Sequence, residues 1–386
     1  MPLYAYHALT MKNEVTIQIE EPQALAGKST RGQRIPIGTP GDYKLCVAQL
    51  PDGTLLAVAF APLALEERKV REEILLFRST DGGSSWSRAE YLTSGQGVLG
   101  REPYFTILKD GTVLITVHFL PQDVRNPSGY TRSFVHRSVD GGASWATAVT
   151  EPEGMQPGMM VCTSRNILEM QDGSLLLGVS GAGSDASYVW RSYDKGATWS
   201  EKYPAKIEEL STEYPWPFFG EGVWWQVPSG KVLLIARLDA HFVGRFTTEV
   251  PEAEFGRSDN LDRMILYRSE DEGHTFTPVR PFGGLGEMYP ALLRLQDGRL
   301  LITFTVRSIR RPLGVRAVVG IEAQDDIEVD LGHDRFMLDT QTADEVYSGG
   351  GFGRTVQLGD GTLVTSYSWR DAEFVLHSEV MRWKLP

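Results

Sequence analysis

The chain has 386 residues, of which 41% are hydrophobic, and its formal net charge is −12. An acidic surface argues against nucleic acid or an anionic membrane as the main partner. No apolar run is long enough to span a membrane. The two cysteines, Cys46 and Cys162, do not support a disulfide framework or a cysteine-based zinc site, and buried free thiols are expected.

The first residues carry no visible targeting signal. Met1–His7 lacks a basic start followed by an apolar run, which is the pattern of a signal peptide. The sequence therefore predicts a cytoplasmic protein, or a secreted one whose signal peptide has been removed. Shortly afterwards Glu14–Glu20 alternates apolar and polar side chains, which predicts a strand.

A short turn motif occurs four times along the chain. Each copy begins with Arg-Ser, has an Asp two residues after the Ser and ends with an aromatic residue. The Asp carboxylate can accept backbone N–H bonds within a tight turn, and the aromatic ring can pack back onto the sheet. These Asp residues are therefore expected to stabilise hairpins rather than to catalyse. The copies are Arg78–Trp86, Arg137–Trp145, Arg191–Trp199 and Arg268–Phe276.

A second repeat places Asp-Gly, or once Ser-Gly, between two apolar runs. Asp-Gly in this setting is the strongest short signal for a β-hairpin. Six such hairpins, alternating with the turn motif, predict an all-β fold, a six-bladed β-propeller of four-stranded antiparallel blades that forms one domain over residues 1–386. The hairpins begin at Asp52, Asp110, Asp172, Ser229, Asp297 and Asp360.

Two features of the ends and loops complete this fold prediction. The last blade lacks one strand, which the N-terminal segment Glu14–Glu20 could supply to close the ring. Long inserts after Arg237 and within Lys202–Phe219 are expected to be loops at the rim of a pocket.

The turn motif resembles the Asp-box, Ser-x-Asp-x-Gly-x-Thr-Trp, of the sialidase (neuraminidase) superfamily. The resemblance covers nearly the whole chain, and the motif is specific for the fold but carries no chemistry. It implies a glycoside hydrolase that removes a terminal acidic sugar, such as a sialic acid, from a glycoconjugate. Neither a metal site nor a cofactor site stands out in the sequence.

Functional residues of propellers gather around the central axis, where the innermost strands begin and the second strands end. Counting from each hairpin therefore predicts which side chains meet there. The ring obtained is unusually polar for strand ends, and it is the predicted site. Its members are Lys44, Glu102, His118, Ser164, Arg165, Glu221, Arg237, Tyr289 and Phe352.

The fourth blade matches the sialidase pattern best. Gly220–Trp225 followed by Ser229–Arg237 looks like the family's Glu strand and its second substrate-binding Arg. The resemblance implies that Glu221 activates the nucleophile and that Arg237 binds the substrate carboxylate. The segment that resembles the one with the family's third Arg offers three candidates, Arg307, Arg310 and Arg311.

Other positions depart from the family. Lys44 stands where the family has the Arg of an Arg-Ile-Pro signature, and Gln33–Pro36, which resembles that signature, lies ten residues too early. Lysine keeps the charge but loses the two-pronged fork for a carboxylate. The nucleophilic Tyr maps to Phe352, so either Tyr347 reaches the axis or the nucleophile is lost. The acid/base Asp has no Asp counterpart, although Glu66 and Glu67 are nearby.

The ring contains the groups that glycoside hydrolysis needs. Two carboxyl groups must flank the bond, one of them protonated, and Glu102 and Glu221 are the candidates. Proximity and burial would raise one pKa, whereas salt bridges with neighbouring Arg residues are the structural alternative. Lys44, Arg165 and Arg237 would converge as an anion-binding cluster, or would only balance the carboxylates.

Three aromatic or imidazole side chains complete the prediction. Tyr289 could act as a nucleophile or donate to the ring oxygen, and His118 could act as a base or acid. Both could equally be packed strand-end residues. Trp224 is one of several tryptophans that could stack on a sugar face.

Two further functions are compatible with these residues. A divergent propeller enzyme could hydrolyse or eliminate at uronic acid, rhamnose or arabinose linkages. A non-catalytic carbohydrate-binding propeller is the third possibility, although crowding titratable groups without a task costs stability.

Overall fold

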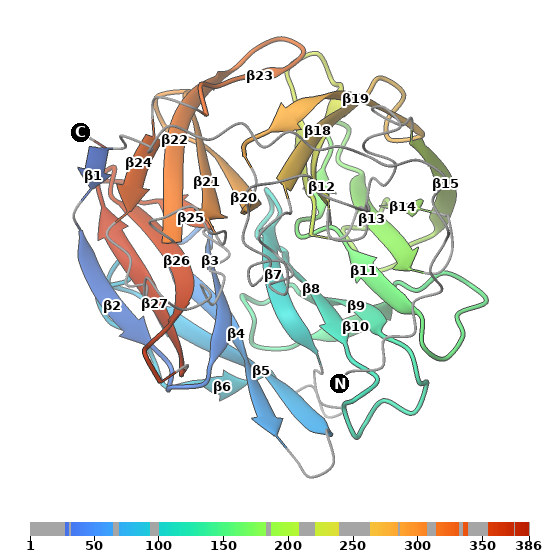
Figure 1. Cartoon of the computed structure of the whole chain (residues 1–386), viewed down its shortest axis with the longest axis horizontal. Coiled ribbons are helices and arrows are strands. Elements are labelled where there is room, and N and C mark those ends of the chain that lie inside the picture. The colour runs from blue at the N-terminus through green and yellow to red at the C-terminus, as the bar shows by residue number, and fades with distance from the viewer. Residues whose placement is uncertain are drawn as a thin grey trace, which may run out of the picture.

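The computed structural model describes residues 28–30, 32–64, 69–92, 100–182, 187–207, 221–238, 263–284, 286–306, 314–331, 335–338, 354–373 and 375–385. Every regular element in these residues is a β-strand, and the strands surround a common centre in a propeller-like arrangement (Figure 1). No helix that could cross a membrane is found in them.

The first two sheets are four-stranded and antiparallel. Strand order follows the chain from the centre outward, β3-β4-β5-β6 in the first sheet and β7-β8-β9-β10 in the second. Their strands are β3 (Tyr43–Gln49), β4 (Leu55–Ala64), β5 (Val70–Ser79), β6 (Glu90–Tyr91), β7 (Arg101–Ile107), β8 (Val113–Phe119), β9 (Arg132–Ser138) and β10 (Ala146–Val149).

The third and fourth strand groups form one continuous sheet. They join at their outer strands, because β15 pairs in parallel with β19 at Lys206↔Thr275 and Ile207↔Phe276. Part of the predicted rim loop Lys202–Phe219 is thus a strand, and the rest lies outside the described residues. The strands are β11 (Met160–Thr163), β12 (Leu168–Glu169), β13 (Leu175–Ala182), β14 (Ser187–Ser192), β15 (Glu201–Ile207), β16 (Val223–Gln226), β17 (Val232–Leu238), β18 (Arg263–Ser269) and β19 (Thr275–Phe282).

The last two sheets both recruit a strand from the beginning of the chain. Strand β1 pairs in parallel with β24, and β2 pairs antiparallel with β27. The strands are β20 (Glu287–Arg294), β21 (Leu300–Val306), β22 (Gly314–Glu322), β23 (Ile327–Glu328), β24 (Arg335–Leu338) and β1 (Lys28–Thr30), then β25 (Thr355–Gln357), β26 (Leu363–Arg370), β27 (Leu376–Trp383) and β2 (Gln33–Ile37).

The strand that closes the last sheet is therefore not the one predicted. Glu14–Glu20 lies outside the described residues, and Gln33–Ile37 pairs with Ser378–Arg382 in its place. Because β2 is the outermost strand of its sheet, the Arg-Ile-Pro sequence within it lies away from the centre. Its likeness to the sialidase signature is thus accidental, as its early position indicated.

All six predicted hairpins are present, each joining an inner strand of a group to the strand that pairs with it. In the first sheet Asp52 accepts a hydrogen bond from the backbone N–H of Thr54 at 2.9 Å. Gly53 follows with a φ of 90°, a conformation that glycine adopts without a steric penalty. The same arrangement recurs at the other hairpins that begin with Asp.

The repeated turn motif has the predicted hydrogen bonds. In the second copy Asp140 Oδ1 accepts from the backbone N–H groups of Ala143 and Ser144 at 3.0 and 2.9 Å. The Trp145 ring folds back and donates from Nε1 to the carbonyl of Gly142 at 3.1 Å. In the first copy hydrogen bonds from Ser85 and Ser79 lower the pKa of Asp81 to about 2. These Asp residues stabilise turns, as predicted.

The hydrophobic core lies between neighbouring sheets rather than within one of them. Leu114 and Val135 of the second sheet pack with Leu175 and Leu177 of the third. Leu55 and Ala57 of the first sheet share a cluster with Val364 of the last. The sheets are therefore held together around the centre by apolar side chains, which contribute roughly 25 cal/mol per Å² buried.

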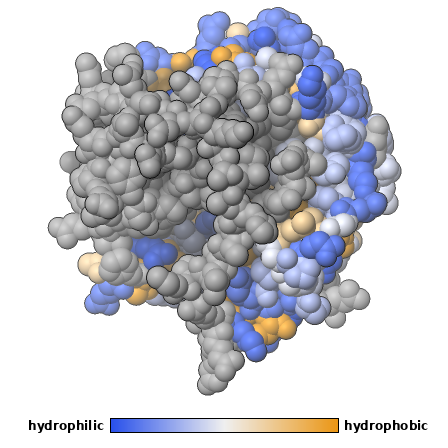
Figure 2. Space-filling model, turned by 45° about the vertical axis from the view of Figure 1, so that its right-hand side comes forward, coloured by the Kyte–Doolittle hydropathy of each residue, from blue (hydrophilic) through white to orange (hydrophobic). Residues whose placement is uncertain are grey.

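The outer surface is mostly hydrophilic, with apolar residues scattered over it, on the described face seen in Figure 2. Cys46 and Cys162 form no disulfide with one another and are both buried, as predicted.

Removing the carboxylate of one turn should weaken the sheet that it stabilises. Asp140→Ala leaves two backbone N–H groups without their acceptor, so we expect the melting temperature to fall by a few degrees. Asp140→Asn, which keeps Oδ1, should lose less. Differential scanning calorimetry of the three proteins tests this, and equal melting temperatures would contradict the role of the carboxylate.

One buried hydroxyl group is expected to destabilise the fold. Tyr267 is fully buried, and its hydroxyl makes no hydrogen bond with any described residue. Tyr267→Phe should therefore leave the free energy of unfolding unchanged or raise it by about 1 kcal/mol. Tyr367→Phe is the matched control, because that buried hydroxyl donates to Glu379 and its loss should destabilise by about 1–3 kcal/mol. Urea unfolding measures both values.

Candidate functional site

Four residues whose side chains reach the centre share the same unusual backbone conformation. Lys44, Glu102, Glu221 and Tyr289 have φ values of 56°, 56°, 59° and 57°, in the left-handed region that few non-glycine residues occupy. At three of these positions the strand pairing shifts by one residue, which is the signature of a β-bulge. The bulge turns a polar side chain toward the centre while its neighbours remain in the core.

The left-handed conformation has an energetic cost that suggests function. It is unfavourable by about 1–2 kcal/mol for an ordinary L-residue. Such conformations persist where the surrounding structure enforces them, and they gather at functional sites. All four positions lie eight residues before a hairpin, although Ser164, at the same position in the third group, does not share the positive φ.

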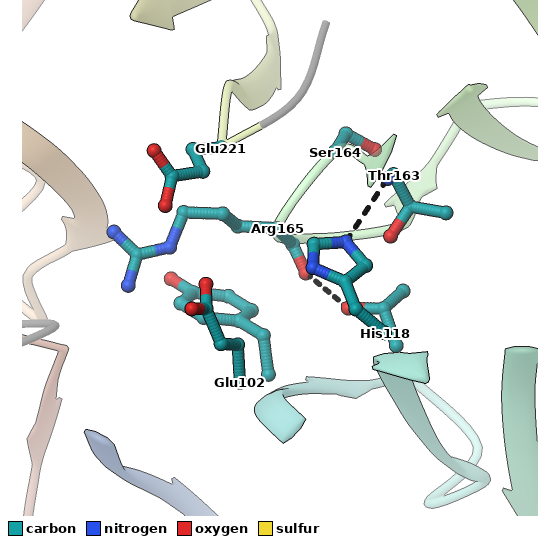
Figure 3. Close-up of a pocket in the computed structure, with 8 residues that line it drawn as sticks. Glu102, His118, Thr163, Ser164, Arg165 and Glu221 are labelled. Atoms are coloured by element: carbon teal, nitrogen blue, oxygen red, sulfur yellow. Dashed lines mark hydrogen bonds between the residues drawn. The ribbon is translucent and has the colours of Figure 1, made fainter. Parts of the chain in front are cut away.

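A small cavity lies among the inner strand ends of the second, third and fourth groups (Figure 3). Its volume of about 10 Å³ leaves room for about one water molecule. The guanidinium group of Arg165 lies between the carboxyl groups of Glu102 and Glu221 in this view. The residues that line the cavity are Glu102, Tyr104, Thr116, His118, Thr163, Ser164, Arg165 and Glu221.

Glu102 and Glu221 each form an ion pair at the centre. The cation that pairs with Glu102 comes from the first sheet, and the cation that pairs with Glu221 comes from β17 of the same strand group. Lys44 pairs with Glu102, and Arg237 pairs with Glu221. A second cation lies beside Glu102, since Arg101 Nε is 3.6 Å from its Oε1. All these side chains are largely buried, so the attraction within each pair is screened much less than at the surface.

Arg165 lies between two aromatic rings. Its Cζ atom is 5.0 Å from the centre of the Tyr104 ring and 4.8 Å from the centre of the Tyr289 ring. A second cation lies near the Tyr104 ring, since Arg354 Cζ is 5.1 Å from the ring centre. Aromatic faces thus hold guanidinium groups at the centre in addition to the carboxylates.

Of the two candidates for the protonated carboxyl group, Glu102 does not have a raised pKa. Burial opposes its ionisation, but the charges of Lys44 and Arg101 outweigh burial and hold its pKa well below the usual range. Glu102 is therefore a carboxylate at neutral pH, and it cannot donate a proton to a leaving group. The nearby positive charges outweigh the cost of burying the carboxylate because one of them, Lys44, is in direct contact with it.

His118 is held in one tautomer. The backbone N–H of Thr163 donates to its Nε2 at 3.2 Å, so the proton of the neutral ring is on Nδ1. Burial lowers the pKa of His118 and keeps the ring neutral, although Glu102 and Glu221 oppose this shift. In the folded protein Nε2 is thus occupied, and Nδ1 is left as a hydrogen-bond donor.

The structure separates the predicted residues into three sets. Lys44, Glu102, His118, Arg165, Glu221, Arg237 and Tyr289 come together at the centre, as predicted, and their roles stay predictions. Trp224 was placed wrongly, because its side chain is fully buried between the third and fourth groups against Phe276 and cannot reach a sugar. Glu66, Glu67, Arg307, Arg310, Arg311, Tyr347 and Phe352 lie outside the described residues.

The sequence analysis missed several side chains of the site. Tyr104 and Thr116 line the cavity, and each is two residues from a predicted member, Glu102 or His118. Alternation in a strand would have indicated Thr116, since residues two apart face the same side, but the bulge between Arg101 and Tyr104 interrupts the alternation beside Glu102. Arg101 was expected only as a possible salt-bridge partner of the carboxylates, and it lies 3.6 Å from Glu102. No group of three or more metal-ligating side chains is found among the described residues.

These repeats and this polar centre define a propeller-like protein of the Asp-box class. Residues 53–325 match the BNR repeat-like domain, and the chain belongs to that family. The resemblance to the sialidase superfamily is thereby confirmed.

Two curated relatives align with part of the chain. A sialidase of Paraclostridium sordellii is 27% identical over 179 residues, which are 43% of this chain and 39% of that protein. A xyloglucanase of Acetivibrio thermocellus is 24% identical over 225 residues, which are 56% of this chain and 23% of that protein. The chain thus covers less than half the length of either relative.

Solved structures resemble the fold over most of the chain. A protein of unknown function from Dyadobacter fermentans has a TM-score of 0.66 at 19% identity and covers 92% of this chain and 98% of its own. An α-L-arabinofuranosidase of Fusarium graminearum with arabinobiose has a TM-score of 0.60 at 15% identity, covering 90% and 97%. The NanB sialidase of Streptococcus pneumoniae has a TM-score of 0.59 at 11% identity, covering 98% and 71%. At these identities the likeness concerns the fold alone.

The neutral state of His118 predicts how stability depends on pH. Because the folded pKa of His118 is below its ordinary value of 6.5, the unfolded chain takes up the proton first as the pH falls. The contribution of His118 to stability is complete above about pH 6.5 and is lost progressively below it. Lys44 and Arg101 act with burial in this direction, whereas Glu102 and Glu221 oppose it.

His118→Gln should flatten this dependence, since the Gln amide oxygen can accept the bond from Thr163 without titrating. Urea unfolding at several pH values between about 5 and 7.5 measures the slope. An equal slope in the variant and the parent protein would contradict the assignment.

Proposed function

We propose that this protein is a sialidase-like glycoside hydrolase that removes a terminal acidic sugar from a glycoconjugate. The observation that carries the proposal is the convergence of Lys44, Arg165 and Arg237 with the carboxylates of Glu102 and Glu221. Because cations outnumber carboxylates among these five side chains, the centre attracts an anionic ligand. A sugar carboxylate is such a ligand.

We also propose that the strand groups are six four-stranded blades. A hydrophobic cluster lies at each junction between consecutive groups, and one more joins the last group to the first. A ring in which every blade contacts two others supports this count. It would also place the inner strand ends around one axis.

Substrate binding can prepare Glu221 for its role. In the described structure Glu221 is held by Arg237, and the cavity has room for about one water molecule. A sugar carboxylate that forms an ion pair with Arg237 would release Glu221 from that pair. The movement of Glu221 would at the same time enlarge the cavity that it lines. The freed carboxylate could then activate a nucleophile, as the resemblance implies, beside a developing oxocarbenium ion.

Glu102 has a different role in this proposal. It remains ionised beside Lys44, so it stabilises positive charge on the sugar ring instead of donating a proton. The leaving-group proton must come from another acid. The sequence offers Glu66 and Glu67, which lie outside the described residues.

A neutral sugar is the second candidate. Lys44 and Arg237 are each neutralised by a carboxylate of the protein itself, and this pairing favours a substrate without a charge. The arabinofuranosidase fold covers nearly all of both chains, which is compatible with an arabinofuranoside. Hydrolysis or elimination at uronic acid or rhamnose linkages, and carbohydrate binding without turnover, are further outcomes that the same assay distinguishes.

Replacing Glu221 tests the chemical role directly. Glu221→Gln should lower kcat by roughly 1,000-fold or more, because the carboxylate acts in the transition state. The fold should be kept, since the amide preserves shape and one acceptor. Glu153→Gln is the matched control, because Glu153 is an exposed surface carboxylate. Full activity of Glu221→Gln would contradict the assigned role.

A panel of aryl glycosides decides the substrate class. Sialic acid, glucuronic acid, rhamnose and arabinofuranose conjugates should be tested with the parent protein, and release of the aryl group measures hydrolysis. We expect the sialoside or another acidic glycoside to be turned over fastest. Preferential cleavage of the arabinofuranoside would favour the second candidate, and an ultraviolet-absorbing unsaturated product would identify a lyase.

A further inference from the structure

Tyr289 occupies the centre of the site but not its cavity. It lies on the bulge of β20 with the same left-handed backbone as Lys44, Glu102 and Glu221. Its side chain is nevertheless only 2% exposed, and it is not among the residues that line the cavity. A side chain so placed is positioned to organise its neighbours.

Three cations from three strand groups surround the Tyr289 ring. Lys44 Nζ lies 5.6 Å from the ring centre, Arg165 Cζ 4.8 Å and Arg237 Cζ 5.7 Å. All three distances are within the range of a cation–π contact, which is about 6 Å. In addition Arg237 Nη1 donates to the Tyr289 hydroxyl at 3.1 Å.

Two of these cations hold the carboxylates of the site. Lys44 pairs with Glu102, and Arg237 pairs with Glu221. Tyr289 is therefore one contact away from both candidate carboxylates. A movement of its ring would shift the cations first and the carboxylates with them.

The chemistry of a neutral aromatic ring suits this position. Cations close together in a buried place repel one another, and water is too scarce to screen them. A third carboxylate would hold them but would cancel the positive excess that attracts an anion. The negative face of a tyrosine ring attracts cations while it adds no net charge.

We propose that Tyr289 is a positioning residue, whose uncharged ring holds Lys44, Arg165 and Arg237 in place, and not the nucleophile. This inference rests on the proposed function for its link to substrate, but its geometric part stands without it. It replaces the catalytic role that the sequence suggested for Tyr289. The aromatic ring, and not the hydroxyl, is the part that the site requires.

Two substitutions separate the ring from the hydroxyl. Tyr289→Phe keeps the ring and loses the bond from Arg237, so kcat should fall less than about 10-fold and KM should change little. Tyr289→Leu loses the ring, so KM for an acidic glycoside and the inhibition constant of the free acid should rise roughly 10-fold or more. A nucleophilic tyrosine would instead lose kcat by about 10,000-fold in the Phe variant, and that result would overturn the proposal.

Crystal structures of both variants provide the readout that needs no turnover. We expect Lys44 and Arg165 to keep their positions in Tyr289→Phe and to move apart in Tyr289→Leu. Unmoved cations in the Leu variant would overturn the proposal. If the Leu variant does not fold, the kinetics and structure of the Phe variant still decide between a positioning residue and a nucleophile. If the parent protein cleaves no glycoside, the proposed function fails, and the two structures alone decide the role of Tyr289.

Discussion

Charged side chains that meet where inner strands converge must be neutralised by one another or by a ligand, because little water reaches them. The centre of this protein meets that constraint with ion pairs and aromatic faces. Lys44 pairs with Glu102, Arg237 pairs with Glu221, and Arg165 lies between two tyrosine rings. The ion pair with Lys44 that stabilises the centre also keeps Glu102 ionised. A substitution that breaks this pair would therefore change both the stability of the fold and the protonation of the site.

The repeats made most of the fold predictable. Asp-Gly hairpins and the Asp-containing turns depend on a few adjacent residues, so their hydrogen bonds follow from local sequence. The closing strand was harder, since Glu14–Glu20 and Gln33–Ile37 both alternate enough to form a strand. Only pairing with β27, far away in the sequence, distinguishes them.

The sequence predicted which residues meet at the site, but not their ion pairs or protonation states. Counting from the hairpins located Lys44, Glu102, Glu221 and Tyr289, because the left-handed backbone recurs at the same distance before the hairpin in these four groups. The count could not tell which cation pairs with which carboxylate, and the pKa of Glu102 depends on that pairing. Trp224 was misplaced because a tryptophan beside the site and one in the core look alike in sequence.

The left-handed backbone at Lys44, Glu102, Glu221 and Tyr289 restricts which residue types can replace them during evolution. Valine, isoleucine and threonine are poorly compatible with a positive φ, because their branched Cβ crowds the backbone. Specificity at these four positions can therefore vary among unbranched, aromatic and small residues, with asparagine, aspartate and glycine the least strained. New substrates would arise here by exchanging one long polar side chain for another, while the strands that carry them remain unchanged.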